Sequence, residues 1–292
     1  LAQKKIENKD QKFLNNMAIV AAWSIYNIKN ATLLAKSAVK DTGLGNVEDK
    51  IKKNQFKILG SLSDIISEKT IGKIDEDKKN GIQTFAKPVG IIASLTPSTN
   101  AAATPAHHIM FSLKAGNSII ISPSPKAQKT VIKLVKIVRK NLIKIDAPPD
   151  LVQCITLKNS LELTNELTSK VDLVIATGDK KIIENSYKSG KPSLGVSQGN
   201  VPVIISSKIN LEIAIDKIIS SKIFDNATSC SSENSIIVEK NKYREIREIF
   251  EKKGAYFASK YETEIIEKNL FINGRLNSEY ICKPIDKFLD LL

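Results

Sequence analysis

The sequence predicts an α/β fold, a doubly wound parallel sheet with a protruding β-hairpin. Two observations lead to this fold class. Four short apolar runs lack polar alternation, as strands buried on both faces do: residues 89–95, 118–122, 151–156 and 171–176. Helical patterns separate or follow these runs, at residues 104–115, 125–141, 160–169 and 179–189. Alternating strands and helices are typical of a parallel sheet with helices on both faces.

The first 66 residues are predicted to form three helices. Apolar residues recur at helical spacing over residues 10–29. Asn30 is expected to cap the next helix, which ends before Gly43, and Asn46 begins a third that runs to about Ile66. Such helices cover a sheet or a domain face, and nothing in them indicates chemistry.

Apolar and polar residues then alternate over residues 70–76 and 82–87, which predicts a two-stranded ribbon. Between the strands, Asn80 and Gly81 are expected to supply the positive φ angles of a tight hairpin turn. Because an isolated ribbon is marginally stable in water, we expect it to pack on another subunit.

Composition argues against several classes of protein. No apolar run approaches the roughly 18 residues of a membrane span, and no leader with a cleavage site opens the chain, so a cytoplasmic protein without a membrane partner is expected. Cys154, Cys230 and Cys282 are too few for a disulfide framework and fit a reducing compartment. The two histidines offer no zinc-ligand spacing, so no metal site is predicted.

The formal net charge of +13 is spread along the chain rather than gathered in one patch. Only four of the 44 basic residues are arginine, the residue that base-edge readers favour, and aromatic residues that would stack on single strands are sparse. We therefore expect no nucleic-acid partner, whereas anionic small molecules stay compatible with the charge.

Polar motifs follow the predicted strands at their carboxyl ends, where doubly wound sheets bind ligands. These motifs are Thr96 to Asn100, Ser122 to Lys126 and Ala176 to Gly178. The G-x-G-x-x-G fingerprint of many dinucleotide-binding sheets is absent, which taken alone argues against a nucleotide.

Cys230 lies in the stretch FDNATSCSSE, residues 224–233, between a helical pattern ending near Lys222 and the apolar run 235–238. Small and polar neighbours predict a turn. The hydroxyls of Ser229, Ser231 and Ser232 are candidate donors to a thiolate, the form of cysteine that attacks electrophiles. The alternative is a buried core cysteine, since free cysteine is among the most buried residue types.

FDNATSCSSE resembles the F-D-N-G-T-x-C-A-S-E cysteine loop of the CoA-acylating branch of the aldehyde dehydrogenase family. Three further motifs resemble that branch in the same order: AKPVGIIASLTPSTN at 86–100, ATG at 176–178 and SGKPSLGVSQGN at 189–200. The resemblance runs from near residue 10 to about residue 280.

This resemblance implies two domains. Residues 1–198 would form a dinucleotide-binding domain, and its hairpin at 70–87 would serve oligomerisation in a homodimer or homotetramer. Residues 199–292 would form the catalytic domain, which is incomplete relative to the family.

The resemblance also implies catalytic roles. Cys230 would attack the aldehyde, and the side-chain amide of Asn100, with the backbone N–H of Cys230, would form the oxyanion hole that a negatively charged tetrahedral adduct needs. The alternative for Asn100 is an Asx cap for the helix that begins near Thr104. His107 and His108, just after this loop, are either a general base or plain surface or packing residues.

NAD or NADP is the implied cofactor. The residues that would contact it are Thr96, Pro97, Ser122, Ser124, Lys126, Thr177, Gly178, Gly195 and Val196.

Ser122 and Pro125 stand where many family members hold the adenosine ribose with lysine and glutamate. No carboxylate then opposes a 2′-phosphate, so Lys126 or nearby polar groups are expected to tolerate NADP. Lys126 is alternatively a solvated residue at a helix start. Asp179 replaces a small residue of the branch and is either an unfavourable neighbour of a pyrophosphate or only a helix cap.

Val196 aligns with the glutamate that activates water in hydrolytic aldehyde dehydrogenases. Without that base, a thioester should persist until the thiol of coenzyme A attacks it. The spelling GVSQGN departs from the usual G-V-G-P-G-N of the branch, which bears on the local turn. The expected activity is therefore CoA-acylating aldehyde oxidation.

TPSTN followed by ATPA at 103–106 resembles the sulfoacetaldehyde dehydrogenases, so sulfoacetaldehyde is the expected substrate. Acetaldehyde or propionaldehyde is an alternative, and so is a hydrolytic enzyme. A further alternative is an inactive, truncated, oligomer-forming relative, because the chain stops at Leu292 and shows no E-K-L-type motif after Cys230.

Overall fold

The computed structural model describes residues 1–157, 160–197, 199–206 and 208–292. The chain divides into two compact units. Unit 1 comprises Leu1–Gly43 and Val47–Gln198, and unit 2 comprises Leu44–Asn46 and Gly199–Leu292.

The elements of unit 1 follow one another as η1 (Gln3–Ile6), α1 (Gln11–Tyr26), α2 (Ile28–Thr42), α3 (Val47–Ile65), β1 (Gly72–Asp77), β2 (Ile82–Ala86), β3 (Ile91–Thr96), α4 (Ala103–Lys114), β4 (Ser118–Pro123), η2 (Pro125–Ala127), α5 (Gln128–Ile143), η3 (Pro149–Leu151), β5 (Val152–Cys154), α6 (Leu161–Ser169), β6 (Leu173–Thr177), α7 (Lys180–Tyr187) and β7 (Ser193–Val196). The elements of unit 2 are β8 (Pro202–Ile205), α8 (Leu211–Ile223), η4 (Phe224–Ala227), β9 (Ser235–Val238), η5 (Lys240–Lys242), α9 (Tyr243–Lys252), α10 (Lys260–Leu270), β10 (Phe271–Ile272), β11 (Arg275–Leu276) and α11 (Asp286–Leu289).

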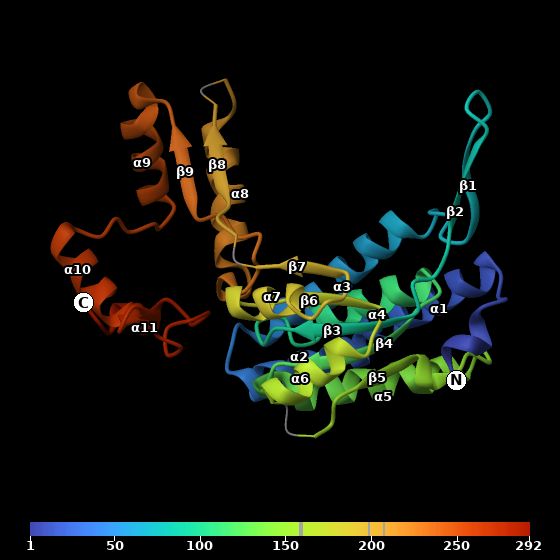
Figure 1. The fold of residues 1–292 in the computed structure, drawn as a ribbon. Helices are drawn as coiled ribbons and strands as arrows, with labels where there is room; N and C mark the ends of the chain where they lie inside the picture. Colours follow the sequence, from blue (N-terminus) through green and yellow to red (C-terminus); the bar gives the residue numbers. More distant parts are fainter. Residues whose placement is uncertain (158–159, 198, 207) are drawn as a thin grey trace. The chain divides into compact units, whose positions relative to one another are not determined.

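Five parallel strands form the sheet of unit 1 in the order β5-β4-β3-β6-β7 (Figure 1). The chain begins at the centre with β3, moves outward through β4 and β5, and returns to add β6 and β7 on the other side. The predicted doubly wound sheet is confirmed. Its strand order reverses between β3 and β6, which is where the ligands of such sheets bind.

The edge strand β7 is absent from the sequence prediction. It pairs with β6 from Ser193 opposite Val174 to Val196 opposite Thr177. Its residues alternate between half-buried and exposed, because an edge strand is not covered like the centre of the sheet.

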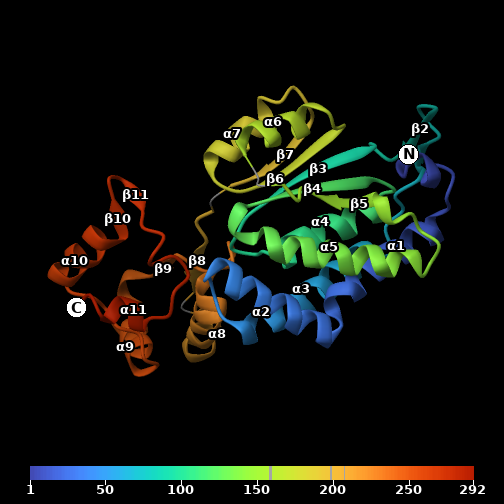
Figure 2. The same cartoon turned by 90° about the horizontal axis from the view of Figure 1, so that it is seen from below.

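Helices cover both faces of this sheet. Figure 2 shows α4 and α5 on one face, with α1 beside them, and α6 and α7 on the other. The larger apolar core lies on the first side and includes Met17, Ile109 and Leu134, all fully buried. A smaller cluster around Val174 and Ala176 lies under α6 and α7. Burial on both faces explains why the central strands are apolar runs.

The N-terminal helices match the prediction except for one cap. The side chain of Asn27, not Asn30, caps α2 by accepting a hydrogen bond from the backbone N–H of Lys29. Asn30 lies one turn inside the helix and donates to the Ser24 carbonyl oxygen. The predicted end holds, since Gly43 adopts φ 68° after Thr42.

The predicted ribbon is confirmed as the antiparallel pair β1 and β2. In its turn Gly81 has φ 68°, whereas Asn80 has a negative φ, so the expected pair of positive angles is wrong. The carboxylate of Asp77 instead closes the loop by accepting hydrogen bonds from the backbone N–H groups of Lys79 and Asn80. These bonds lower the pKa of Asp77, chiefly through the side chain and backbone of Asn80.

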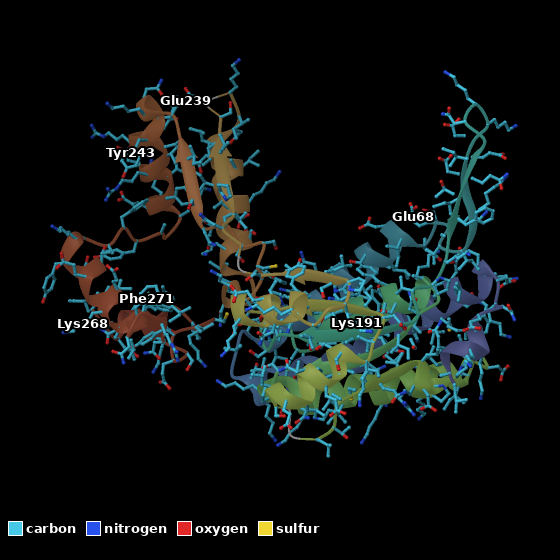
Figure 3. The ribbon with its side chains drawn as sticks, viewed as in Figure 1. Glu68, Lys191, Glu239, Tyr243, Lys268 and Phe271 are labelled. Atoms are coloured by element: carbon cyan, nitrogen blue, oxygen red, sulfur yellow. The ribbon has the colours of Figure 1, made fainter. Side chains whose placement is uncertain are left out.

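Unit 2 contains the parallel pair β8 and β9 packed on α8 and α9. Its core includes Ile205, Ile215 and Phe250. Glu239 and Tyr243, labelled in Figure 3, mark the connection from β9 into α9. No helix among the described residues is long and apolar enough to cross a membrane.

Candidate active site

A cavity of about 410 Å³ opens at the carboxyl ends of β3, β4 and β6, at the point where the strand order reverses. Six residues from the predicted cofactor set line it together: Thr96, Pro97, Ser122, Ser124, Thr177 and Gly178. The sheet topology brings these residues together because parallel strands end at one edge.

The polar groups of this cavity suit a dinucleotide. Thr96 lines the cavity, and its hydroxyl is buried and has no hydrogen-bond partner within the described residues. Ser98, Ser124 and Ser160 add further hydroxyls from three different connections.

Among the described residues that line this cavity, Asp179 is the one with a charged side chain. Its carboxylate caps α7 by accepting a hydrogen bond of 2.9 Å from the backbone N–H of Ile182. The cap interpretation of Asp179 is therefore confirmed.

Three residues of the predicted cofactor set do not line the cavity. Lys126 is exposed in η2, as its alternative interpretation has it. Gly195 lies on β7, where a Cβ atom would come within 2.7 Å of the Ile183 side chain, so close packing against α7 requires glycine there. Val196 is exposed at the end of β7, beside Thr177. Gln198 of the same motif lies outside the described residues.

Asn100 lies in the loop between β3 and α4. The Asx-cap alternative is wrong, because Ala102 is the N-cap of α4 and no side chain caps that helix. The Asn100 side-chain oxygen instead accepts a hydrogen bond of 3.0 Å from Nζ of Lys53 on α3. One turn earlier on α3, Lys50 Nζ lies 3.4 Å from the carbonyl oxygen of Thr99.

The histidines behave as packing residues. His108 Nδ1 lies 2.8 Å from the Ser94 hydroxyl on β3. Desolvation lowers the pKa of His108 to about 4, with a further contribution from the neighbouring His107. His107 lies 3.2 Å from the Lys57 carbonyl oxygen through Nε2, and burial also lowers its pKa. The structure directs His108 to the sheet rather than to the loop of Asn100.

Cys230 lies on a turn between η4 and β9 in unit 2, and its side chain is exposed, so the core-cysteine alternative is wrong. Cys154 and Cys282 are only partly exposed, and burial raises the pKa of the Cys154 thiol. Ser232 does not donate to the Cys230 sulfur as expected. Its hydroxyl is turned inward, where it is buried and makes no hydrogen bond within the described residues.

The residues before Cys230 adopt an unusual backbone. Asp225, Asn226 and Ala227 have φ angles of 52°, 50° and 56°, in the left-handed region that L-residues other than asparagine and aspartate seldom adopt. The Asp225 carboxylate is fully buried and accepts hydrogen bonds from the Thr228 hydroxyl and, at 2.9 Å, from the backbone N–H of Asn46. These two hydrogen bonds fix the backbone of the residues that precede Cys230.

Sequence reasoning missed Lys53 and the structural role of Asp225. Lys53 carries no local signal, because it contacts a loop 47 residues away along the chain. Asp225 lies inside the cysteine motif, and a short acidic side chain beside a tight turn was the available signal. No group of three or more potential metal ligands occurs in the described ranges.

The profile of the aldehyde dehydrogenase family matches residues 17–259. The sulfoacetaldehyde dehydrogenase (acylating) of Cupriavidus necator is 45% identical over 237 residues, which make up 81% of this chain and 48% of that protein. The chain spans about half the length of the curated relatives it matches.

Two solved structures share the fold. An acetylating aldehyde dehydrogenase from Geobacillus thermoglucosidasius has a TM-score of 0.93 at 34% identity, over 99% of this chain and 64% of that chain. A propionaldehyde dehydrogenase from Rhodopseudomonas palustris, with bound CoA and an acylated cysteine, has a TM-score of 0.87 at 26% identity, over 99% and 66% of the two chains.

Proposed function

The chain belongs to the aldehyde dehydrogenase family, and from this premise we propose that the protein is a CoA-acylating aldehyde dehydrogenase. The observation that carries the proposal is the exposed thiol of Cys230 on a turn. An exposed thiol can meet a substrate carbonyl, whereas a packed one cannot. The relatives support the acylating branch, since two of them are described as acylating or acetylating.

In the proposed reaction the Cys230 thiolate adds to the aldehyde carbon, and a C–S bond forms. The carbonyl oxygen becomes an oxyanion, which the side-chain amide of Asn100 stabilises as a preorganised donor. The adduct then loses a hydride and becomes a thioester. Bound NAD or NADP supplies the acceptor for that hydride. The CoA thiol attacks the thioester, which releases acyl-CoA and returns the thiolate.

The reaction balances as aldehyde, CoA thiol and NAD(P)+ giving acyl-CoA, NAD(P)H and one proton. Val196 favours CoA over water as the acyl acceptor, because valine has no group that could deprotonate water. A thiol is the better nucleophile when no base assists. The propionaldehyde dehydrogenase with an acylated cysteine and bound CoA supports the same two stages.

We place the cofactor in the cavity at the ends of β3, β4 and β6. Thr96, Ser122, Ser124, Thr177 and Gly178 line it, and the buried Thr96 hydroxyl is the group that most needs a partner. Ser122 and Pro125 of this lining stand where a ribose-binding glutamate would repel a 2′-phosphate, so we propose that NADP is accepted beside NAD. Strict dependence on NAD would reject this part.

Sulfoacetaldehyde is the proposed substrate, on the motif TPSTN-AAATPA and on the relative from Cupriavidus necator. Acetaldehyde and propionaldehyde are the competing candidates, because the similar solved structures include an acetylating aldehyde dehydrogenase and a propionaldehyde dehydrogenase. We further propose that the β1–β2 ribbon packs on a second copy of the chain in a homodimer or homotetramer, since Ile74, Ile82 and Phe85 are exposed on it.

A spectrophotometric assay of NAD(P)H formation tests the proposal. The protein is supplied with sulfoacetaldehyde, acetaldehyde or propionaldehyde, with and without CoA, and with NAD+ or NADP+. The proposal expects reduction that requires CoA and is fastest with sulfoacetaldehyde. Equal reduction without CoA would indicate the hydrolytic alternative, and equal rates with all three aldehydes would remove the sulfonate preference.

A further inference from the structure

We propose that Lys53 is a positioning residue that sets the direction of the Asn100 amide. The inference rests on the proposed function and names a residue that the reaction scheme above does not contain. It starts from one contact, the hydrogen bond of 3.0 Å from Lys53 Nζ to the Asn100 side-chain oxygen.

The chemistry of the two groups fixes which way the amide faces. A protonated lysine has three N–H donors and no acceptor, so its partner must present oxygen. The amide NH₂ of Asn100 then points to the opposite side, and both of its donors are directed away from Lys53. The flipped amide would set two N–H groups against the ammonium, and donors that face a positive charge are repelled. An oxyanion hole needs N–H donors that face the substrate oxygen, and only an amide whose oxygen faces Lys53 leaves its NH₂ group free to do this.

The support behind Lys53 is rigid. Its side chain is only 5% exposed, and it projects from α3, which packs against α1, α2 and α4. The adjacent Asn54 on α3 donates to the carbonyl oxygen of Ala31, which ties α3 to α2. An amide held in this way is preorganised, so little free energy is needed to keep it oriented during the reaction.

The loop itself is held beside that helix. Lys50 Nζ lies 3.4 Å from the Thr99 carbonyl oxygen, and Ala101 and Ala102 are buried next to the two lysines. Lys50 therefore holds backbone, and Lys53 holds the side chain that would do chemistry. The charge of Lys53 also polarises the amide carbonyl, which strengthens the N–H donors on the other side.

The size of the expected effect follows from what is lost. Removal of an oxyanion-hole donor costs about 100- to 1,000-fold in kcat. In Lys53→Met the Asn100 amide is still present but faces the oxyanion only part of the time. The variant should therefore lose less than a donor deletion, about 10- to 50-fold in kcat. KM should change much less, because the oxyanion exists only after the substrate has bound.

Lys114 offers a matched control. It is a lysine buried to 2% exposure in the same unit, and its Nζ donates to the side-chain oxygen of Asn15 at 2.6 Å and to the carbonyl oxygen of Glu68. Glu68, labelled in Figure 3, lies after the end of α3. Lys114→Met removes a buried lysine bonded to an asparagine, as Lys53→Met does, without touching Asn100.

The experiment measures kcat and KM for the wild type, Lys53→Met, Lys53→Arg, Lys114→Met, Asn100→Ala and the double variant Lys53→Met/Asn100→Ala, with thermal denaturation of each. We expect Lys53→Met to lose kcat selectively and Lys53→Arg to recover most of it. Lys114→Met should lower the melting temperature and leave kcat within about 3-fold, and Lys53→Met should add little when Asn100 is already alanine.

Full kcat in Lys53→Met, or an equal loss of kcat in the Asn100→Ala background, would overturn the inference. So would a loss in Lys53→Met that Lys53→Arg does not relieve. If Lys53→Met does not fold, Lys53→Arg and Lys53→Gln decide. Arginine and glutamine both retain N–H donors, so both variants should keep most of the wild-type kcat, and a loss in both as large as that in Asn100→Ala would overturn the inference. An inactive wild type would contradict the proposed function instead, which separates the two failures.

Discussion

Thr228 donates its hydroxyl hydrogen bond to the buried carboxylate of Asp225, and this contact lies two residues before Cys230. The other oxygen of the same carboxylate accepts from the backbone N–H of Asn46. One side chain therefore joins the cysteine loop to a separate segment of unit 2. The carboxylate of Asp225 is therefore a structural anchor of the loop that carries Cys230.

Asp225→Asn should lower the free energy of unfolding by about 1.5–3 kcal/mol, because it removes the charge from two buried hydrogen bonds. Urea denaturation followed by circular dichroism measures the change. Asp179→Asn is the control, since Asp179 is exposed and asparagine caps a helix as well as aspartate. An Asp225→Asn protein as stable as the control would contradict the structural role of this carboxylate.

Ala227→Gly should stabilise the protein. Ala227 has φ 56°, which costs an L-residue about 1–2 kcal/mol and costs glycine nothing. The greater freedom of glycine in the unfolded chain offsets about 0.5–1 kcal/mol, so a net gain of about 0.5–1 kcal/mol is expected.

The matched change is Ala255→Gly, at a position with negative φ. It should destabilise the protein by about 0.5–1 kcal/mol. Denaturation midpoints of the two variants test the claim together, and a loss of stability in both would show that the backbone at residue 227 carries no strain.

The lowered pKa of buried His108 should make the stability of the protein depend on pH. Its pKa is about 4 in the folded protein and near 6.5 in the unfolded chain, so the unfolded chain binds more protons between these values. The free energy of unfolding should therefore fall as the pH drops from 6.5 to 4, by about 3 kcal/mol from this residue. His107 acts in the same direction.

His108→Asn isolates the effect, because the asparagine side chain can replace Nδ1 in the contact with Ser94 and does not titrate. The slope of unfolding free energy against pH, measured by denaturation from pH 7 to pH 4, should be shallower in the variant than in the wild type. Parallel slopes would mean that His108 is not desolvated.

Val196→Glu should introduce hydrolytic activity. Val196 is exposed on β7, so a carboxylate there carries little desolvation cost. A positioned general base is worth about 100- to 10,000-fold, and an unoptimised one should still raise CoA-independent NAD(P)H formation about 10-fold. Val196→Gln has the same size without a base and should leave that rate unchanged. Equal CoA-independent rates in the two variants would argue against the role assigned to this position.

The apolar runs of the central strands predicted most of unit 1, because strands buried on both faces are apolar at nearly every position. β7 could not be predicted in this way, because an edge strand of four residues that includes a glycine has no apolar run. The cap of α2 was misplaced by three residues because Asn27 and Asn30 are chemically equal candidates, and only the path of the chain distinguishes them.

In the candidate site, too, features with a local sequence signal were predictable, and contacts set by tertiary packing were not. The turn at Cys230 was predictable from its small polar neighbours, and the cavity from motifs at strand ends. The partner of Asn100 was not, because a contact between α3 and the loop after β3 depends on how helices pack rather than on any local pattern. For Lys126, exposure in the structure favours the simpler of its two interpretations.

The central claim is that Cys230 carries the acyl group until CoA removes it. Intact-protein and peptide mass spectrometry after mixing the protein with aldehyde and NAD(P)+ in the absence of CoA tests this most directly. The account predicts an acyl adduct on the peptide that contains Cys230, which disappears when CoA is added and does not form in Cys230→Ala. An adduct on Cys154 or Cys282, or NAD(P)H formation that persists in Cys230→Ala, would contradict it.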